Sequence, residues 1–368
     1  MAVDLVCPAC GETFADRWRC TCGAPLEFAS CPRPEGPAPD RSAFDPRRGL
    51  WAFDDFIPVE PSVTLGEGFT PLVDAPSLDA TVKLEYVSPT GSFKDRGAAT
   101  VVSRAVEVGA DRVIEDSSGN AGAAIAAYAA RAGLDADVYV PASVAAAKRR
   151  AIEATGARVV EIEGDREAVA EACREAVGEA SPRGDGDAVG GGWYASHAWN
   201  PAFFAGTATF GVELAAQRDW SVPDAVVVPL GHGTLLLGAY RGFRALADAG
   251  WIDGLPRLLA VQATGYAPVA DGRGGADPDA DANDLADGIR IREPVRRARI
   301  EDALDATDGD AVAVPEAAVR DALADLRESG FAVEPTAAVA PAGLRAYRDR
   351  GVVGADADVV VPLTGRAK

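Results

Sequence analysis

Short apolar segments alternate with longer amphipathic segments along most of this chain, starting at residue 82. The apolar runs have the length of buried strands, and the longer segments carry apolar residues at helical spacing. Strands are predicted near residues 82–86, 112–116, 137–141, 157–162, 225–230, 257–262, 311–314 and 357–362. Helices are predicted near residues 93–108, 121–132, 143–155, 165–178, 202–218, 233–249, 315–329 and 335–349. Because strands that alternate with helices pair in parallel, the pattern predicts an α/β fold with open, doubly wound, mostly parallel sheets covered by helices.

Three of the predicted strands lead into short turns that contain glycine. Residues 117–122 (Ser-Ser-Gly-Asn-Ala-Gly) follow the strand near 112–116, and residues 231–234 (Gly-His-Gly-Thr) follow the strand near 225–230. A helix is predicted after each of these two turns, and the backbone N–H groups at a helix start favour an anion. The last strand leads into residues 362–365 (Pro-Leu-Thr-Gly). Each turn taken alone also fits a simple helix start, and a dinucleotide site fits poorly because the G-x-G-x-x-G fingerprint is missing.

Lys94 is one of four lysines in the chain, whose basic charge is otherwise carried by arginine. It lies in residues 92–97 (Ser-Phe-Lys-Asp-Arg-Gly), at the predicted start of a helix. A lysine amine can form a Schiff base once its pKa is lowered, whereas a guanidinium stays protonated and is not nucleophilic. Lys94 is therefore a candidate for covalent amine chemistry, and a solvated lysine at a helix start is the alternative.

Taken together and in this order, the lysine segment, the two glycine turns and the last strand end resemble parts of the fold-type II pyridoxal-phosphate enzymes. Threonine synthase and its relatives are the most similar, followed by the serine/threonine dehydratases. The resemblance covers residues 60–368 and includes residues 66–72 (Gly-Glu-Gly-Phe-Thr-Pro-Leu) and 334–338 (Glu-Pro-Thr-Ala-Ala). It implies a tryptophan synthase beta-like fold with two sheet domains and the cofactor in a cleft at the carboxyl ends of the strands.

The resemblance also implies a role for each site residue. Lys94 forms the Schiff base with pyridoxal phosphate and, once released, takes the α-proton of the substrate. Asn120 donates to the 3′ oxygen of the cofactor, and Thr364 faces the pyridine nitrogen, where a neutral hydroxyl favours elimination and replacement over transamination. Glu334 is a weaker candidate near the cofactor ring. The residues that bind the cofactor phosphate are Gly231, His232, Gly233 and Thr234, and those that bind the substrate carboxylate are Ser117, Ser118 and Ala121.

Residues 200–206 (Asn-Pro-Ala-Phe-Phe-Ala-Gly) depart from the threonine synthase pattern Asn-Pro-Tyr-Arg-x-x-Gly. Phe203 stands where the resemblance places the arginine that binds the substrate phosphate. A guanidinium binds phosphate through two parallel hydrogen bonds, and a phenyl ring offers nothing equivalent. His197 is a candidate for a replacing polar contact or a packed side chain, and Arg290 or Arg292 is a candidate for reaching the phosphate instead.

The leading interpretation is a pyridoxal-phosphate-dependent carbon–oxygen lyase of the threonine synthase type, which converts phosphohomoserine and water to threonine and phosphate. The first alternative is a serine/threonine ammonia-lyase or a β-replacement enzyme with a small non-phosphorylated substrate, which Phe203 favours. The second is a non-catalytic zinc-ribbon interaction protein on the same scaffold, which the presence of Lys94, Asn120 and Thr364 disfavours.

Five of the six cysteines lie within the first 31 residues. Cys7 and Cys10 form one pair, Cys20 and Cys22 form another, and a glycine follows each pair. Four thiolates on two tight turns suit tetrahedral Zn²⁺ and leave no open coordination position, so the pattern predicts a structural zinc ribbon over residues 1–35. A disulfide framework is the alternative, which a reducing cytoplasm disfavours. The other cysteines are predicted to be a spare thiol, Cys31, and a packed helix residue, Cys173.

The chain carries 56 acidic and 36 basic side chains, which gives a net charge of −20. Nucleic-acid phosphates would be repelled, so no nucleic-acid partner is expected. The acidic excess with few lysines resembles proteins of high-salt cytoplasms, and an ordinary acidic enzyme is the alternative. No apolar run approaches the ~20 residues of a membrane helix, and the N-terminus lacks the pattern of a signal peptide. We therefore expect a cytoplasmic homodimer that acts on a small amino acid and binds no membrane.

The resemblance and the composition together predict three regions. The ribbon is followed by a large cofactor-binding domain into which a smaller domain is inserted. The predicted limits are 1–35 for the ribbon, 36–97 with 206–368 for the large domain, and 98–205 for the inserted domain.

Overall fold

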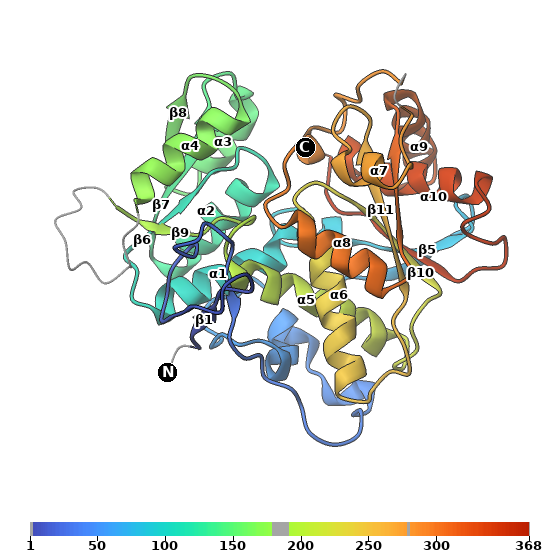
Figure 1. The fold of residues 1–368 in the computed structure, drawn as a ribbon, viewed down its shortest axis with the longest axis horizontal. Coiled ribbons are helices and arrows are strands. Elements are labelled where there is room, and N and C mark those ends of the chain that lie inside the picture. Colours follow the sequence, from blue (N-terminus) through green and yellow to red (C-terminus); the bar gives the residue numbers. More distant parts are fainter. Residues whose placement is uncertain (1–2, 179–190, 278–279, 368) are drawn as a thin grey trace. The chain divides into compact units, whose positions relative to one another are not determined.

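The computed structural model of the protein describes residues 3–178, 191–277 and 280–367 (Figure 1). The chain forms two compact units, and each unit is assembled from separate stretches of sequence. Unit 1 comprises Met1–Pro34, Phe44–Gly68 and Lys94–Thr207, and unit 2 comprises Glu35–Ala43, Phe69–Phe93 and Ala208–Lys368. Phe93 therefore ends a stretch of unit 2, and Lys94 begins a stretch of unit 1. The domain limits predicted from the sequence stay predictions.

Unit 1 begins with a small antiparallel sheet, which within the described residues has three strands in the order β2-β1-β3. β1 (Leu5–Val6) pairs with both β2 (Thr13–Phe14) and β3 (Glu27–Phe28). Strands of two residues bury little apolar surface, and an element this small depends on a crosslink or a metal for its stability. Its buried cluster consists of Leu5, Cys7, Cys20 and Leu26.

The larger sheet of unit 1 has four parallel strands in the described part of the chain, in the order β8-β7-β6-β9. The strands are β6 (Arg112–Glu115), β7 (Asp135–Pro141), β8 (Arg158–Ile162) and β9 (Trp193–Tyr194). The helices before, between and after them are α1 (Lys94–Glu107), α2 (Asn120–Ala132), α3 (Ala146–Glu153), α4 (Arg166–Val177) and α5 (Pro201–Gln217), the last of which continues into unit 2.

Neighbouring side chains of β6 pack on opposite faces of this sheet. Val113 belongs to a buried cluster that includes Ile125 of α2. Ile114 belongs to a second cluster that includes Val169 of α4. Because successive residues of a strand point to opposite faces, helices cover the sheet on both sides, as the alternating sequence pattern predicts.

Unit 2 contains a six-stranded sheet, counted over the described residues, in the order β12-β11-β10-β13-β5-β4. The strands are β4 (Leu72–Ala75), β5 (Ala80–Lys83), β10 (Ala225–Pro229), β11 (Arg257–Ala263), β12 (Asp310–Val314) and β13 (Val359–Pro362). β4 is an antiparallel edge strand, and the other strands pair in parallel. Every residue of β10 and β13 is buried, which is typical of parallel strands covered on both faces.

Helices follow most strands of unit 2. The α-helices are α6 (Thr234–Asp248), α7 (Pro268–Gly272), α8 (Arg297–Ala306), α9 (Glu316–Glu328) and α10 (Val339–Asp349). Short 3₁₀ segments occur in both units, at Arg41–Ala43, Pro46–Phe56, Glu85–Val87, Asp287–Ile289 and Pro335–Ala338.

The predicted α/β fold with mostly parallel sheets is confirmed. Each strand and helix expected from residue 82 onward has a counterpart within a few residues of its predicted limits. The sequence pattern missed β4, β9, α7 and α8, and α7 is only five residues long. β4 is a half-exposed edge strand, β9 is two residues long, and α8 has charged residues around a narrow apolar stripe, whose buried members are Ile300, Ala303 and Leu304.

A buried ion pair joins the sheet of unit 2 to the part of α5 that lies in that unit. Nζ of Lys83, at the end of β5, lies 2.6 Å from Oε1 of Glu213, and neither side chain is exposed. The same carboxylate accepts the backbone N–H groups of Phe69 and Thr70 at 2.8 and 2.9 Å. The pair therefore anchors the chain that leads into β4.

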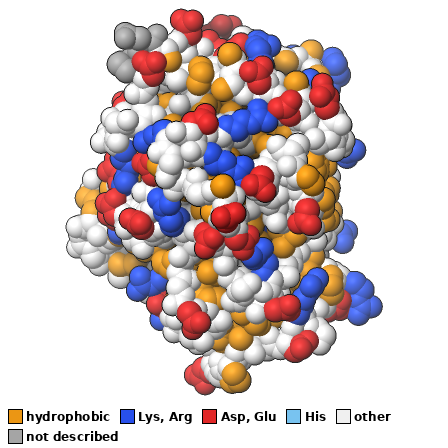
Figure 2. Space-filling view, turned by 90° about the vertical axis from the view of Figure 1, so that its right-hand side faces the viewer, with side chains coloured by type: hydrophobic (Ala, Val, Ile, Leu, Met, Phe, Trp, Pro, Cys, Tyr) orange, Lys and Arg blue, Asp and Glu red, His pale blue; other side chains and the backbone are white. Residues whose placement is uncertain are grey.

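Acidic and basic side chains are interspersed over the face shown in Figure 2. Many arginines pair with a carboxylate one helical turn away, as Arg297 does with Glu301 at 2.8 Å. On this face the negative charge is thus spread among arginines. Among the helices of the described residues, none combines the length and the apolar character needed to cross a bilayer.

Candidate active site

Lys94 is the first residue of α1 and is half-buried. The backbone N–H of Phe93, the preceding residue, donates to the carbonyl of Thr364 at 3.1 Å. Ser92 forms an antiparallel bridge with Gly365. Thr364 directly follows β13 and is buried. The structure therefore places Thr364 beside the residue that is covalently bonded to Lys94.

Residues 117–122 connect β6 to α2. The Oγ of Ser117, a buried side chain, accepts the backbone N–H of Gly119 at 3.3 Å. A Cβ on Gly122 would lie 1.8 Å from the Ser117 carbonyl oxygen, so this close approach of helix and turn requires glycine. The residue before α2, Gly119, has no side chain that could cap the helix, and the N–H groups and dipole of a helix start suit a carboxylate. The other predicted residues of this turn are Ser118, half-buried, and Ala121, buried.

Residues 231–234 connect β10 to α6. Gly233 has a φ of 79°, which favours glycine, and a Cβ there would lie 2.6 Å from Ile300. A Cβ on Gly231 would lie 3.2 Å from the Cα of Ile289. The residue before α6, Gly233, likewise offers no side-chain cap, and the N–H groups and dipole of the helix start suit an anion. A turn with two glycines that leads into a helix start fits the phosphate of pyridoxal phosphate. The other two residues of the turn are His232, half-buried, and Thr234, buried.

The predicted cofactor residues divide between the two units. Lys94 and Asn120 belong to unit 1, whereas residues 231–234 and Thr364 belong to unit 2. The backbone N–H of Glu334 donates to the carbonyl of Gly365 at 3.0 Å, which brings this weaker candidate to the end of β13. The roles of these residues stay predictions.

The structure adds a buried acid–base pair that sequence reasoning missed. Glu115, the last residue of β6, is fully buried, and its Oε1 lies 2.7 Å from Nδ1 of His197. Its Oε2 accepts the backbone N–H of His197 at 3.2 Å. The sequence had singled out His197 but had treated Glu115 as an ordinary strand residue. An acidic residue at the end of an otherwise apolar strand was the signal that could have identified it.

Burial controls the charge of this pair. It raises the pKa of Glu115 to about 8, against the lowering effects of the His197 N–H, Arg166 and Lys94. Burial also lowers the pKa of His197 to about 3, and the positive charge of Lys94 adds to this lowering. At neutral pH the imidazole is therefore neutral and the carboxyl group is mostly protonated.

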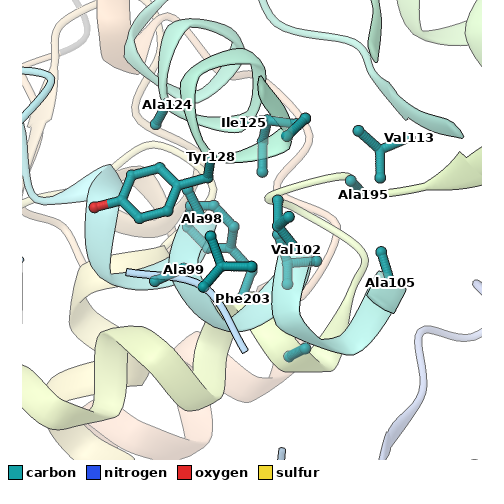
Figure 3. Close-up of a cluster of buried hydrophobic side chains, with 14 of the residues drawn as sticks. Ala98, Ala99, Val102, Ala105, Val113, Ala124, Ile125, Tyr128, Ala195 and Phe203 are labelled. Carbon is teal, nitrogen blue, oxygen red and sulfur yellow. The ribbon is translucent and has the colours of Figure 1, made fainter. Parts of the chain in front are cut away.

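Phe203 does not face a substrate. Its side chain has no exposed surface and lies in the core of unit 1 with Ala98, Ala99 and Val102 (Figure 3). A Cβ on Gly97, in α1, would lie 2.3 Å from its ring. Phe203 therefore offers no group that could bind a substrate phosphate, and the predicted consequence for the substrate stays a prediction.

The four cysteines of the predicted ribbon converge. The Sγ atoms of Cys7 and Cys22 lie 3.6 Å apart, and those of Cys10 and Cys20 lie 3.4 Å apart. All four sulfurs lie within 4.8 Å of one another, which fits four thiolates around one tetrahedral metal ion. The cysteines outside this cluster are Cys31, which is exposed, and Cys173, which is buried in α4.

Arg104 of α1 holds the ribbon against the rest of unit 1. Its buried guanidinium donates to the carbonyls of Val3 and Ala15, each at 3.1 Å. Asp16 lies 3.5 Å from the same guanidinium and accepts the indole N–H of Trp193, in β9, at 2.8 Å. The ribbon is thus bound to the helix that begins at Lys94 and to the strand that leads to the Glu115–His197 pair.

Trp18 makes a second contact between the ribbon and the region around β9. Its ring packs edge-to-face against Tyr194 and Trp199, with centroids 5.4 and 5.1 Å away. Its indole N–H donates to the carbonyl of Gly178 at 3.0 Å. Three aromatic rings therefore fill the space between the ribbon and the larger sheet of unit 1.

Comparison with curated proteins identifies relatives over most of the chain. The threonine synthase of Methanosarcina acetivorans is 34% identical over 330 residues, which cover 86% of this chain and 79% of that protein. The threonine synthase of Methanocaldococcus jannaschii is 31% identical, with coverage of 98% and 91%.

Solved structures with the same fold include an L-serine ammonia-lyase from Rhizomucor miehei, at 24% identity and a TM-score of 0.66, which covers 81% of this chain and 93% of that chain. A threonine deaminase from Solanum lycopersicum is 23% identical with a TM-score of 0.65, and the coverage is 81% and 84%. The family described as pyridoxal-phosphate dependent enzyme matches residues 63–365. Since this match spans both glycine turns, Lys94 and the end of β13, the chain belongs to the family of pyridoxal-phosphate dependent enzymes.

Proposed function

We propose that this protein is a pyridoxal-phosphate-dependent lyase of the threonine synthase type, which converts phosphohomoserine and water to threonine and phosphate. The observation that carries the proposal is the 31–34% identity to threonine synthases over 79–91% of their length. The placement of Thr364 beside the residue that precedes Lys94 supports it, because both are assigned to the same cofactor.

Pyridoxal phosphate, when bound, supplies the electron sink for charge at the substrate α-carbon. Lys94 anchors the cofactor and, as a free amine, takes the α-proton. Asn120 would hold the ring oxygen of the cofactor, and Thr364 would hold its ring nitrogen. Residues 231–234 bind the cofactor phosphate at the start of α6. Residues 117–121 bind the substrate carboxylate at the start of α2 and so orient the α-proton toward the amine.

Arg290 and Arg292 are candidates for binding the substrate phosphate. A Cβ on Gly231 would lie 3.3 Å from Ile291, the residue between them, so both arginines lie close to the 231–234 turn. Their guanidinium groups lie over the ring of Tyr266, at 5.2 and 4.7 Å from its centroid. An aromatic face orients a guanidinium. Arg290 also pairs with Asp284 at 3.3 Å, and Arg292 donates to the carbonyl of Gly265 at 3.0 Å. Replacing either arginine by alanine should raise the KM for phosphohomoserine.

The test of the function is the product released by the wild-type holoenzyme. Release of inorganic phosphate from phosphohomoserine, together with threonine formation, supports the threonine synthase reaction. Release of ammonia from serine or threonine without phosphate release from phosphohomoserine would replace it with the ammonia-lyase alternative. If neither substrate reacts, although the cofactor is bound covalently, the proposed reaction class is wrong.

We propose that the four-cysteine cluster binds Zn²⁺ in a structural role. Support comes from the convergence of the four sulfurs, which lie within 4.8 Å of one another. The ion would stabilise the small sheet β2-β1-β3, whose buried cluster already contains two of the ligands, Cys7 and Cys20.

We further propose that the protein works as a homodimer in a cytoplasm of high salt concentration. The net charge of −20 supports the salt requirement, because self-repulsion at this charge is screened by salt. Sedimentation in low and in molar potassium chloride, together with unfolding measured in the same buffers, tests the homodimer and the salt requirement. A monomer at all salt concentrations, with unchanged stability, contradicts them.

A further inference from the structure

Glu115 and His197 lie at the ends of neighbouring parallel strands. β6 ends at Glu115, and its partner β9 ends at Tyr194, shortly before His197. Parallel strands present their carboxyl ends at one edge of a sheet, where α/β proteins bind their ligands. The turn at 117–122, which starts α2, leaves the same edge. The pair therefore lies on the functional side of unit 1.

The start of α1 lies near His197, because the His197 ring is 6.0 Å from the Phe203 ring, which lies against Gly97, three residues after Lys94. The positive charges of Lys94 and of Arg166, in α4, lower the pKa of both partners. Asp116 acts on the imidazole as an anion, and its Oδ1 accepts the hydroxyl of Ser196 at 3.2 Å. The close contact between Oε1 and Nδ1, at 2.7 Å, is the main polar contact between the two side chains.

We propose that Glu115 and His197 form a positioning pair that shares its protons through the Oε1–Nδ1 contact and, by staying uncharged, keeps Lys94 able to react as a free amine.

Two protonation states of the pair contain a neutral imidazole. In the first state Glu115 is protonated, its O–H donates to Nδ1, and the ring proton is on Nε2. In the second state one proton has left to solvent, Glu115 is a carboxylate, and Nδ1–H donates to it. The pKa of about 8 for Glu115 places the change between the two states near pH 8. Raising the pH therefore moves the ring proton from Nε2 to Nδ1 without forming an imidazolium.

The second protonation state places a negative charge on Glu115, and this charge acts on Lys94. Because Lys94 influences the pKa of both partners, their charge acts on Lys94 in return. A carboxylate at Glu115 stabilises the protonated nitrogen of Lys94, which has no lone pair for bond formation or proton abstraction. A protonated, uncharged Glu115 does not stabilise that protonated form. This consequence rests on the proposed cofactor role of Lys94, whereas the proton sharing does not.

Proton sharing can be observed directly, because the chain contains two histidines. Nitrogen-15 imidazole spectra of the holoenzyme, assigned with His232→Asn, should show a neutral His197 at all pH values well above 3. The ring proton should move from Nε2 to Nδ1 near pH 8. In Glu115→Gln the amide donates to Nδ1 at every pH, and one tautomer should persist. A wild-type ring that becomes imidazolium near pH 6.5, or that keeps one tautomer, overturns the proposal.

The effect on Lys94 is tested with borohydride, which fixes the bound cofactor to the protein. The measured profile is the extent of this reaction as a function of pH. Glu115→Gln should move the midpoint of this profile to lower pH by about one unit, because no carboxylate forms beside Lys94. The matched control is Glu67→Gln, a second glutamate of unit 1 whose pKa burial raises and whose carboxylate accepts the Tyr128 hydroxyl at 2.7 Å. This control should keep the wild-type profile.

His197→Asn provides a second variant in case Glu115→Gln fails to bind the cofactor. Loss of the imidazole removes the proton-sharing partner and should also displace the borohydride profile. Profiles that coincide for wild type, Glu115→Gln and His197→Asn overturn the proposal. Normal spectra and shifted profiles without turnover of phosphohomoserine would instead contradict only the proposed substrate.

Discussion

Lys83 and Glu213 form an ion pair whose two side chains have no exposed surface and whose charged atoms lie 2.6 Å apart. Lys83→Met should lower the free energy of unfolding by about 3–5 kcal/mol, because the glutamate remains buried without its cation. Replacing both residues by apolar ones should cost less than the single change. Chemical denaturation measures both effects, and Lys148→Met, at a partly exposed lysine of α3, is the control. Equal stability of Lys83→Met and wild type would contradict the role of the pair.

Lys94→Ala should abolish covalent attachment of pyridoxal phosphate. The variant should keep its fold, with a free energy of unfolding within about 1 kcal/mol of wild type, since a half-buried lysine at a helix start contributes little packing. Borohydride reduction followed by peptide mapping checks this. Cofactor attached to Lys148, or an unchanged visible spectrum in the variant, would show that Lys94 does not bind the cofactor covalently.

Phe203→Arg should destabilise unit 1 and should not improve the use of phosphohomoserine. The new guanidinium would be buried without a partner beside Gly97, at a cost of at least about 3 kcal/mol. Phe203→Leu is the control and should cost about 1–2 kcal/mol. A stable Phe203→Arg protein with a lower KM for phosphohomoserine would show that this position reaches the substrate after all.

The stability of unit 1 should depend on pH through the Glu115–His197 pair. The pKa of Glu115 is raised from 4.5 to about 8, so its contribution is complete below pH 4.5 and is lost as the pH rises toward 8. The pKa of His197 is lowered from 6.5 to about 3, so its contribution is complete above pH 6.5 and is lost as the pH falls toward 3. The pair therefore contributes most between pH 4.5 and 6.5. Relative to Glu115→Gln, the free energy of unfolding of wild type should fall from pH 4.5 to 8. Chemical denaturation at a series of pH values measures it, and a constant difference between the two proteins would contradict this prediction.

The ribbon should bind one zinc ion per chain. Cys20→Ser should remove the metal and destabilise the small sheet, because the site supplies much of its folding free energy. Cys31→Ser, at an exposed cysteine outside the cluster, should keep the metal. Metal analysis of protein made under reducing, zinc-replete conditions measures the number of zinc ions per chain. A metal-free wild type, or equal metal content in both variants, would contradict the zinc assignment.

The sequence was sufficient for the fold because its strands are buried on both faces and bounded by glycine turns. β10 and β13 are continuous apolar runs, and Gly122 and Gly233 mark points where a helix starts against a strand end. α8 was missed because its apolar stripe is narrow and charged residues surround it. The ribbon was found from cysteine spacing, which is independent of helix or strand periodicity.

The candidate site was predicted less completely, because side-chain direction depends on tertiary packing. Phe203 occupies a motif position that suggests contact with substrate, yet α5 turns its ring into the core against Gly97. Glu115 and His197 are far apart in sequence, and only the parallel pairing of β6 with β9 brings them together. Periodicity gives no information on such pairing between distant strands.

The packing of the ribbon has a consequence for optical measurements. Of the six tryptophans in the chain, Trp18, Trp193 and Trp199 lie where the ribbon contacts the larger sheet of unit 1. Trp220 and Trp251, whose rings pack 4.8 Å apart, lie in unit 2. The sixth, Trp51, is buried in unit 1. Detachment of the ribbon would bring water to the first group and shift its fluorescence emission to the red. The protein thus carries an intrinsic fluorescent reporter of whether the ribbon stays attached to unit 1, and no added dye is needed.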